Sequence, residues 1–232
     1  MPLAALQVWL RVQSVAWSGW LVATAWFGAA APPWWGNALF GALLLSGFGL
    51  AAILRVGRRA ADAVTAARFV TLLVAVGLAF AGSANAVWVA TAAVMLDLVD
   101  GAVARRFGGS PQGAVFDMEV DQLTVLALAA VVVAQGGGVH VLLLPALRYA
   151  FVLAMWWAGA PAHDPKPKHG DNRRGRRVCA AVMTVLLLAL WPPLPALLRD
   201  LLTAAAVALL AWSFADDAKF LLAHRRGAKA GA

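Results

Sequence analysis

The sequence predicts an all-α integral membrane protein, a polytopic bundle of about eight transmembrane helices. Of its 232 residues, 62% are hydrophobic and 13% are charged, whereas soluble domains average roughly 45–50% apolar and about 25% charged residues. The apolar residues extend along the whole chain, which disfavours a soluble domain with a single anchor, and disorder is excluded because disordered chains are poor in apolar residues. The only cysteine is Cys179, so a disulfide-stabilised fold is excluded as well.

Eight apolar stretches support this prediction, because a helix needs roughly 20 apolar residues to cross a bilayer. They cover residues 6–28, 36–54, 66–81, 86–105, 114–134, 139–159, 178–192 and 199–222. The seventh stretch is short and ends at Trp191-Pro192-Pro193, since proline has no N–H to donate within a helix. Short loops join the stretches, and no linker is long enough to separate soluble domains.

The loops alternate in charge along the chain. Those near residues 55–68, 105–113 and 160–177, and the C-terminal tail, carry nearly all the Lys and Arg, whereas those near 30–35, 82–85, 135–138 and 192–198 carry none. Basic loops mark the cytoplasmic side of membrane proteins, so we expect a multi-pass protein of the cell membrane with both termini in the cytoplasm. This pattern accounts for the net charge of +8. We expect no nucleic-acid binding, because no basic stretch is interleaved with aromatic residues.

Four carboxylates stand out against the apolar background. Asp97 and Asp100 are three residues apart on the fourth stretch, and Asp117 and Asp121 are four apart on the fifth. Each spacing places its pair on one face of a helix. A turn over residues 105–113 joins the two stretches as an antiparallel hairpin. At 1.5 Å per residue, Asp97 and Asp121 lie at similar depths, each roughly 12 Å from the turn, so the four carboxylates are predicted to face one another.

Such a cluster requires positive charge nearby. A charge inside a membrane protein is costly, and close carboxylates repel one another. A divalent cation removes both problems, and carboxylate oxygens suit Mg²⁺ or Mn²⁺. The small residues Gly101 and Ala104 lie on the face of the first pair and leave room for a ligand. With Arg105 beside them, the residues predict a site for a metal-bound diphosphate.

This segment resembles the signature of the CDP-alcohol phosphatidyltransferase family. In this chain the signature residues are Asp97, Asp100, Gly101, Ala104, Arg105, Gly113, Asp117 and Asp121, and all are present. The spacer before Gly113 is one residue shorter than in the family pattern, and the shortening falls in the turn. Upstream, Asp62, Thr65 and Arg68 are similar to the family's Asn/Asp-x-x-Thr-x-x-Arg entry to its first core helix.

The resemblance covers roughly residues 60–222, or six of the eight stretches. It therefore implies three parts of the chain. Residues 1–58 form two additional N-terminal transmembrane helices, residues 59–224 form the six-helix family core, and residues 225–232 form a basic cytoplasmic tail.

The resemblance also implies a reaction. A CDP-lipid, most often CDP-diacylglycerol, donates its phosphatidyl group to the hydroxyl of a polar alcohol in phospholipid biosynthesis, and CMP is released. By analogy, Asp97, Asp100 and Asp117 hold two Mg²⁺ or Mn²⁺ ions, while Asp121 contributes to the metal site and acts as the catalytic base. The positions that match family contacts to the CDP-lipid are Asp62, Thr65, Gly101, Ala104, Arg105 and Ser110. Ser110 matches only when counted back from Gly113.

Three arginines are candidates for binding the acceptor alcohol: Arg68, Arg148 and Arg176. Arg148 lies within the sixth stretch, where an intramembrane arginine indicates function; the alternative is a structural pair with Glu119. The loop that contains Arg176 has six basic residues, which either gather an anionic acceptor or attach to anionic lipid headgroups. The many arginines favour a phosphorylated acceptor, but serine and a second lipid stay open. Membrane lipids and a second copy in a homodimer are the other expected partners.

Two other functions compete with this interpretation. A membrane prenyltransferase also binds a diphosphate through Mg²⁺ and aspartate, but it needs a second aspartate-rich motif, which the remaining aspartates do not supply. A divalent-cation transporter would need polar residues in both halves of the membrane. The halves away from the basic loops are nearly free of ionisable groups, apart from the regions of Arg148 and Arg199.

Overall fold

The computed structural model describes residues 3–27, 32, 34–56, 59–157 and 173–230; within these ranges the side chains at 3–4, 98, 100, 173, 217–218 and 220–230 are not described. The described residues form eight α-helices and a short 3₁₀ helix, with no strand, which confirms the all-α prediction. The helices are α1 (Leu3–Phe27), α2 (Trp35–Leu54), α3 (Ala60–Phe80), α4 (Ala86–Phe107), α5 (Pro111–Ala134), η2 (Val139–Leu142), α6 (Leu143–Trp157), α7 (Arg173–Ala189) and α8 (Ala196–Ala230).

Each predicted stretch corresponds to one helix, and the helices differ from the stretches mainly in length. The helix α3 begins at Ala60, and α8 continues to Ala230, so both include polar residues that lie outside the apolar windows. Alanine, arginine and lysine favour helix, and these residues therefore extend the helices beyond their apolar parts. As a result, residues 225–230 of the predicted basic tail are helical.

Five segments among the described residues are long and apolar enough to cross a membrane: α2, α3, α4, Val139–Trp157 and Ala196–Asp216. The other three helices, α1, α5 and α7, are less apolar or shorter than these five segments. Arg11 interrupts α1, three acidic residues lie on α5, and α7 has only 17 residues and begins with a cluster of arginines. The chain is an integral membrane helical bundle in which α5, despite its three acidic residues, packs against α2, α3, α6 and α7.

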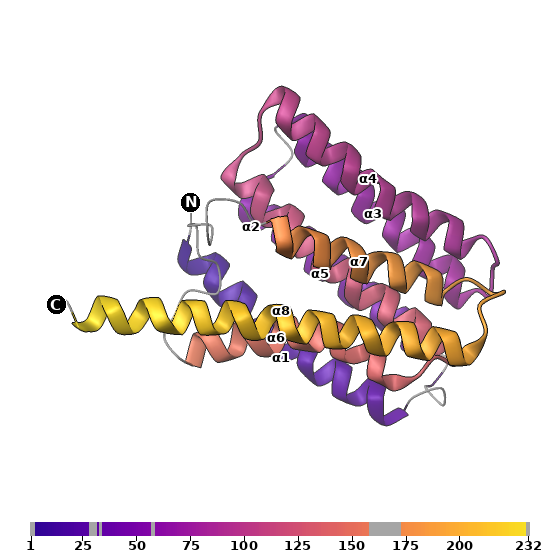
Figure 1. Cartoon of the computed structure of the whole chain (residues 1–232). Helices are drawn as coiled ribbons and strands as arrows, with labels where there is room; N and C mark the ends of the chain where they lie inside the picture. The colour runs from indigo at the N-terminus through magenta and orange to yellow at the C-terminus, as the bar shows by residue number, and fades with distance from the viewer. Residues whose placement is uncertain (1–2, 28–31, 33, 57–58, 158–172, 231–232) are drawn as a thin grey trace.

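The helices pack in pairs around α5. In Figure 1, α3 and α4 lie side by side, and α7 lies beside α8, whose C-terminal end extends past the other helices. The helix α1 packs on α6, and α5 contacts α2, α3, α6 and α7.

The two ends of the bundle follow the predicted alternation of loops. At one end, Arg59 donates a hydrogen bond to the Gly109 carbonyl, which joins the start of α3 to the α4–α5 turn. At the other end, the Arg199 guanidinium donates to the Gly136 carbonyl over 2.7 Å, which joins the start of α8 to the end of α5. The basic loops that the structure describes therefore share one end of the bundle.

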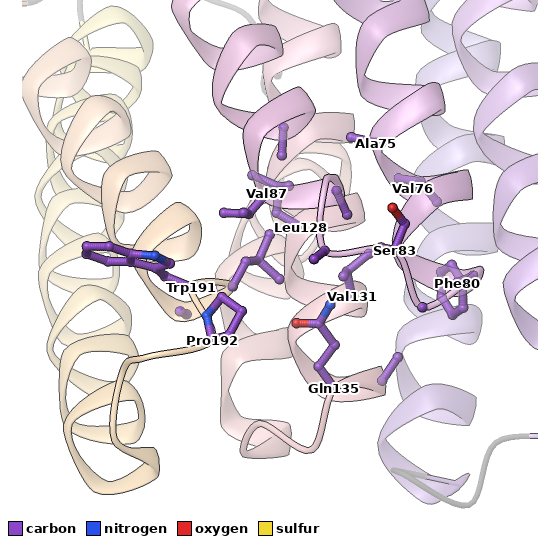
Figure 2. A pocket seen from close by; sticks show the side chains of 18 of the residues that line it. Ala75, Val76, Phe80, Ser83, Val87, Leu128, Val131, Gln135, Trp191 and Pro192 are labelled. Atoms are coloured by element: carbon purple, nitrogen blue, oxygen red, sulfur yellow. The ribbon is translucent and has the colours of Figure 1, made fainter.

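A cavity of about 630 Å³ opens at the end opposite the basic loops. Figure 2 shows Phe80, Leu128, Val131, Gln135 and Trp191 around it, from the C-terminal parts of α3 and α5 and the loop after α7. None of the predicted site residues lines this cavity.

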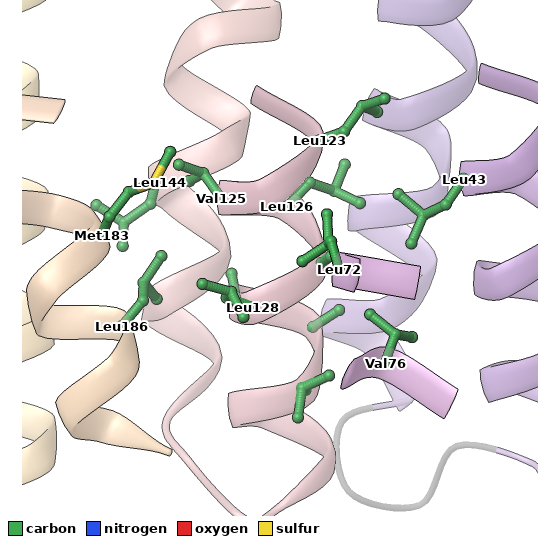
Figure 3. Packing of buried hydrophobic residues seen from close by; sticks show 14 of the residues in the cluster. Leu43, Leu72, Val76, Leu123, Val125, Leu126, Leu128, Leu144, Met183 and Leu186 are labelled. Atoms are coloured by element: carbon green, nitrogen blue, oxygen red, sulfur yellow. The ribbon is translucent and has the colours of Figure 1, made fainter. Parts of the chain in front are cut away.

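The apolar core is centred on α5 (Figure 3). Every residue from Leu123 to Val133 of this helix is buried, as expected for a helix that is apolar on all sides. Leu72 of α3, Leu43 of α2 and Leu186 of α7 pack around it. This core holds the polar first half of α5 in a fixed position between its neighbours.

Candidate functional site

Three of the four predicted carboxylates converge between α4 and α5. Asp97 comes from α4, and Asp117 and Asp121 come from α5. Each offers one oxygen atom, and these atoms lie within 4.8 Å of one another. The side chains are 39%, 38% and 22% exposed, respectively, so the cluster is partly open to a ligand. The predicted convergence is confirmed for these three residues, whereas the side chain of Asp100 lies outside the described residues.

A short turn brings the two helices together. The helix α4 ends at Phe107, and Gly108 follows with a φ of 82°, a conformation that glycine adopts without strain. Ser110 then caps α5: its hydroxyl oxygen accepts a hydrogen bond of 2.8 Å from the Gly113 N–H. Pro111 occupies the first helical position, where its fixed φ favours helix initiation. The one-residue shortening of the spacer thus lies between two intact helices.

The Arg68 guanidinium lies among the three carboxylates. Its Nη1 contacts Asp97, and its Nη2 lies 2.9 Å from Asp117 Oδ1 and 3.0 Å from Asp121 Oδ1. Nη2 also donates to the Asp117 carbonyl over 3.2 Å. Only 2% of the Arg68 side chain is exposed. This contact was not predicted; the sequence suggested Arg68 only as an acceptor-binding residue, a role that stays a prediction.

The buried face of α3 carries the other residues of the upstream motif. Asp62, Thr65 and Arg68 recur every three residues and are all buried. The Asp62 carboxylate lies against the first turn of α5, because a Cβ atom added to Gly113 would be 2.2 Å from Asp62 Oδ1 and 3.0 Å from Ser110 Oγ. Glycine at position 113 therefore leaves the space that the carboxylate occupies. The Thr65 hydroxyl donates to the Ala61 carbonyl over 3.2 Å.

The small residues of the signature lie near the α4–α5 turn. A Cβ atom at Gly101 would be 3.3 Å from Arg105 Nη1, so the Arg105 side chain extends back over Gly101. A Cβ atom added to Gly109 would be 3.9 Å from the Ala104 methyl group. Arg105 is exposed. Arg105 is thus the one charged side chain among these four residues.

The other two acceptor candidates lie in different surroundings. Arg148 Nη2 is 3.1 Å from Glu119 Oε1, and both side chains are buried, so the structure contains the ion pair that the sequence left as the alternative. Arg176 is exposed in the first turns of α7. Its neighbour Arg174 pairs with Asp216 of α8 over 2.5 Å. Most of the basic loop before α7, residues 158–172, lies outside the described residues.

The donor set suits a divalent cation. Three carboxylate oxygens from two helices approach one another at 4.8 Å or less, and all of them are hard ligands of the kind that Mg²⁺ and Mn²⁺ accept. Partial exposure leaves room for further ligands from water or substrate. Among the described residues, this is the one group of three or more carboxylate, histidine or cysteine side chains with such spacing.

The fold and the site together define an integral membrane protein with a carboxylate cluster at the basic end of a helical hairpin. A family model of CDP-alcohol phosphatidyltransferase matches residues 58–214. This match covers more than half of the chain, which therefore belongs to the CDP-alcohol phosphatidyltransferase family. No curated protein and no solved structure matches the chain. Membership implies transfer of a phosphatidyl group from a CDP-alcohol, within a family known for divalent metal use.

Proposed function

We propose that the protein transfers the phosphatidyl group of a CDP-lipid, CDP-diacylglycerol, to the hydroxyl of a polar alcohol and releases CMP. The observation that carries this proposal is the convergence of Asp97, Asp117 and Asp121 within 4.8 Å at the basic end of the α4–α5 hairpin. Divalent cations held by carboxylates can neutralise the charge of a diphosphate. Among the described residues there is no second acidic cluster, which disfavours the prenyltransferase alternative.

Asp97, Asp100, Asp117 and Asp121 would hold two Mg²⁺ or Mn²⁺ ions. Bound there, the ions would neutralise the diphosphate and stabilise the oxygen that leaves with CMP. The acceptor oxygen forms a new bond to the phosphorus of the phosphatidyl group, and the bond from this phosphorus to the CMP oxygen breaks. The acceptor proton must leave as the new bond forms.

Asp121 accepts that proton in this proposal. It lies one turn deeper on α5 than Asp117, and at 22% exposure it is the least exposed of the three described carboxylates. Asp121 is therefore placed to act as a general base once the acceptor is bound.

The donor would bind along the start of α5 and the end of α4. Asp62, Thr65, Gly101, Ala104, Arg105 and Ser110 are the proposed contacts. Asp62 lies against Gly113 in the first turn of α5, and the Ser110 hydroxyl, which accepts from the Gly113 N–H, still has its own hydrogen to donate. The guanidinium of Arg105 supplies positive charge beside the diphosphate.

The acceptor is a polar alcohol, and the basic surroundings favour a phosphorylated one. Arg68, Arg148 and Arg176 are its proposed contacts, and Arg176 is the exposed member of the three. We place the site at the cytoplasmic face, with both chain termini on that side, because basic loops stay in the cytoplasm. A homodimer in the cell membrane completes the proposal.

The test is CMP release by the purified full-length chain in lipid micelles that contain CDP-diacylglycerol. A panel of glycerol phosphate, inositol phosphate, serine and a lipid alcohol identifies the acceptor. EDTA should abolish release, and Mg²⁺ or Mn²⁺ should restore it. Full activity in EDTA would contradict the metal assignment, and no release with any alcohol and either metal would contradict the donor.

A further inference from the structure

Arg68 contacts the same carboxylates that are proposed to hold the metal. Its guanidinium reaches Asp97 on α4 and both Asp117 and Asp121 on α5. Arg68 Nη2 lies 3.0 Å from Asp121 Oδ1 and 2.9 Å from Asp117 Oδ1. The group of three with oxygens within 4.8 Å consists of the same residues. A metal ligated there would therefore share its ligands with an arginine.

The positive charge of Arg68 is permanent. A guanidinium stays protonated at any physiological pH, and its donors form a rigid planar fork. The Arg68 side chain is also only 2% exposed, and its Nη2 donates a further hydrogen bond of 3.2 Å to the Asp117 carbonyl. Its guanidinium is therefore held from several sides. Three carboxylates and one guanidinium leave the group negative, but less negative than the carboxylates alone.

We propose that Arg68 is a built-in competitor of the divalent cation, which lowers the affinity of the carboxylate cluster for metal while keeping the cluster assembled. This inference rests on the proposed function and adds a regulator to the same site. A unit charge about 4 Å from another changes an affinity by roughly fivefold even in water, and by more in a partly buried site. Against a divalent ion the effect is larger still.

The competition makes metal binding depend on the substrate. The diphosphate brings negative charge to the cluster, so it offsets the repulsion between Arg68 and the entering cation. The cation should therefore bind weakly to the protein alone and more tightly together with a CDP compound. Arg68 acts through the metal ligands and is a positioning residue for the cluster.

The experiment measures Mn²⁺ binding to the full-length protein in detergent, by the electron paramagnetic resonance signal of free Mn²⁺ and without any turnover. Arg68→Gln removes the charge and keeps most of the side chain. Arg106→Gln is the matched control, because Arg106 is exposed, lies at the same end of α4 and faces the Phe107 ring. We expect Arg68→Gln to bind Mn²⁺ about tenfold or more tightly than the wild type, and Arg106→Gln to bind it with wild-type affinity.

Thermal unfolding gives a second readout. In EDTA, Arg68→Gln should unfold at a lower temperature than the wild type, because the carboxylates repel one another, and Mn²⁺ should raise its melting temperature by more than it raises that of the wild type. Arg68→Lys keeps a charge but loses the planar fork of donors, so its Mn²⁺ affinity should lie between those of the wild type and Arg68→Gln. This variant keeps the test decisive if Arg68→Gln does not fold.

The outcomes separate this inference from the proposed function. If the wild type binds Mn²⁺ and neither Arg68 variant binds it more tightly, the competition is refuted while the metal site stands. If neither the wild type nor any variant binds Mn²⁺ at millimolar concentration, with or without CDP, the metal site itself is refuted. Equal tightening in Arg106→Gln and Arg68→Gln would assign the effect to net charge and overturn the role of Arg68.

Discussion

Replacement of Gly113 by alanine tests whether the start of α5 is built around Asp62. The new Cβ atom would stand 2.2 Å from Asp62 Oδ1, so the carboxylate must retreat by about 1 Å to reach ordinary van der Waals contact. Asp62 is 4% exposed and has a short side chain, so its carboxylate has little freedom to move. Overpacking of this kind costs about 1–3 kcal/mol, and the higher helix propensity of alanine returns up to about 1 kcal/mol.

The same displacement of Asp62 should also weaken binding of the donor. If Asp62 contacts the CDP moiety, a displaced carboxylate loses a charge-assisted hydrogen bond worth about 1.5–3 kcal/mol. We therefore expect Gly113→Ala to weaken CDP binding by roughly 10- to 100-fold. The free energy of unfolding should fall by about 0–3 kcal/mol, the overpacking cost less the propensity gain. CDP affinity in detergent, CMP release and the melting temperature together measure these effects.

A matched glycine provides the control. Gly77 lies on α3, and a Cβ atom added there would meet no atom within 4 Å. Gly77→Ala should therefore fold, bind CDP and release CMP as the wild type does. A Gly113→Ala protein with wild-type CDP affinity and wild-type turnover would refute both the packing argument and the role of Asp62.

Three further predictions follow from the same structure. Asp121→Asn should retain CDP-lipid affinity and lose about 10²–10⁴-fold in CMP release; a parallel loss of binding would make Asp121 chiefly a metal ligand. Glu119→Gln should lower stability by about 3 kcal/mol, whereas Glu119→Leu combined with Arg148→Met should restore most of it, and an unchanged melting temperature in the single variant would contradict the buried pair. In a cysteine-free background, a cysteine at Gly137 should react with impermeant reagents from outside and one at Asp171 only after the inner face is opened; the reverse pattern would invert the proposed orientation.

The fold was largely predictable because membrane spans are set by composition over long windows. Each apolar stretch became a helix, and the Pro192-Pro193 pair ended α7 close to its predicted end. The helix ends were harder to predict, since residues 60–65 and 223–230 lie outside the apolar stretches and are compatible with either helix or loop. Packing and helix propensity, which a hydropathy window does not contain, decided them.

The carboxylate cluster was predictable because it depends on one hairpin. Spacings of three and four residues fix the faces of α4 and α5, and a short turn fixes their relative depth. Arg68 could not be assigned in the same way, because its partners lie on two other helices. The three-residue spacing of Asp62, Thr65 and Arg68 was the available signal, and it indicates a shared helix face without saying what that face contacts. Arg148 likewise required the packing of α6 on α5 before its pair with Glu119 could be chosen.

Contacts at two levels fix α3 against α5. Near the turn, Asp62 meets Gly113, and deeper in the bundle Arg68 meets Asp117 and Asp121. Both helices begin at the same end, so six residues along α3, about 9 Å, span the distance between the two levels. A shift of one residue in either helix would rotate its side chains by about 100° and break both contacts together. The spacing of the α3 motif therefore links the space for the donor to the charge balance of the carboxylates on α5.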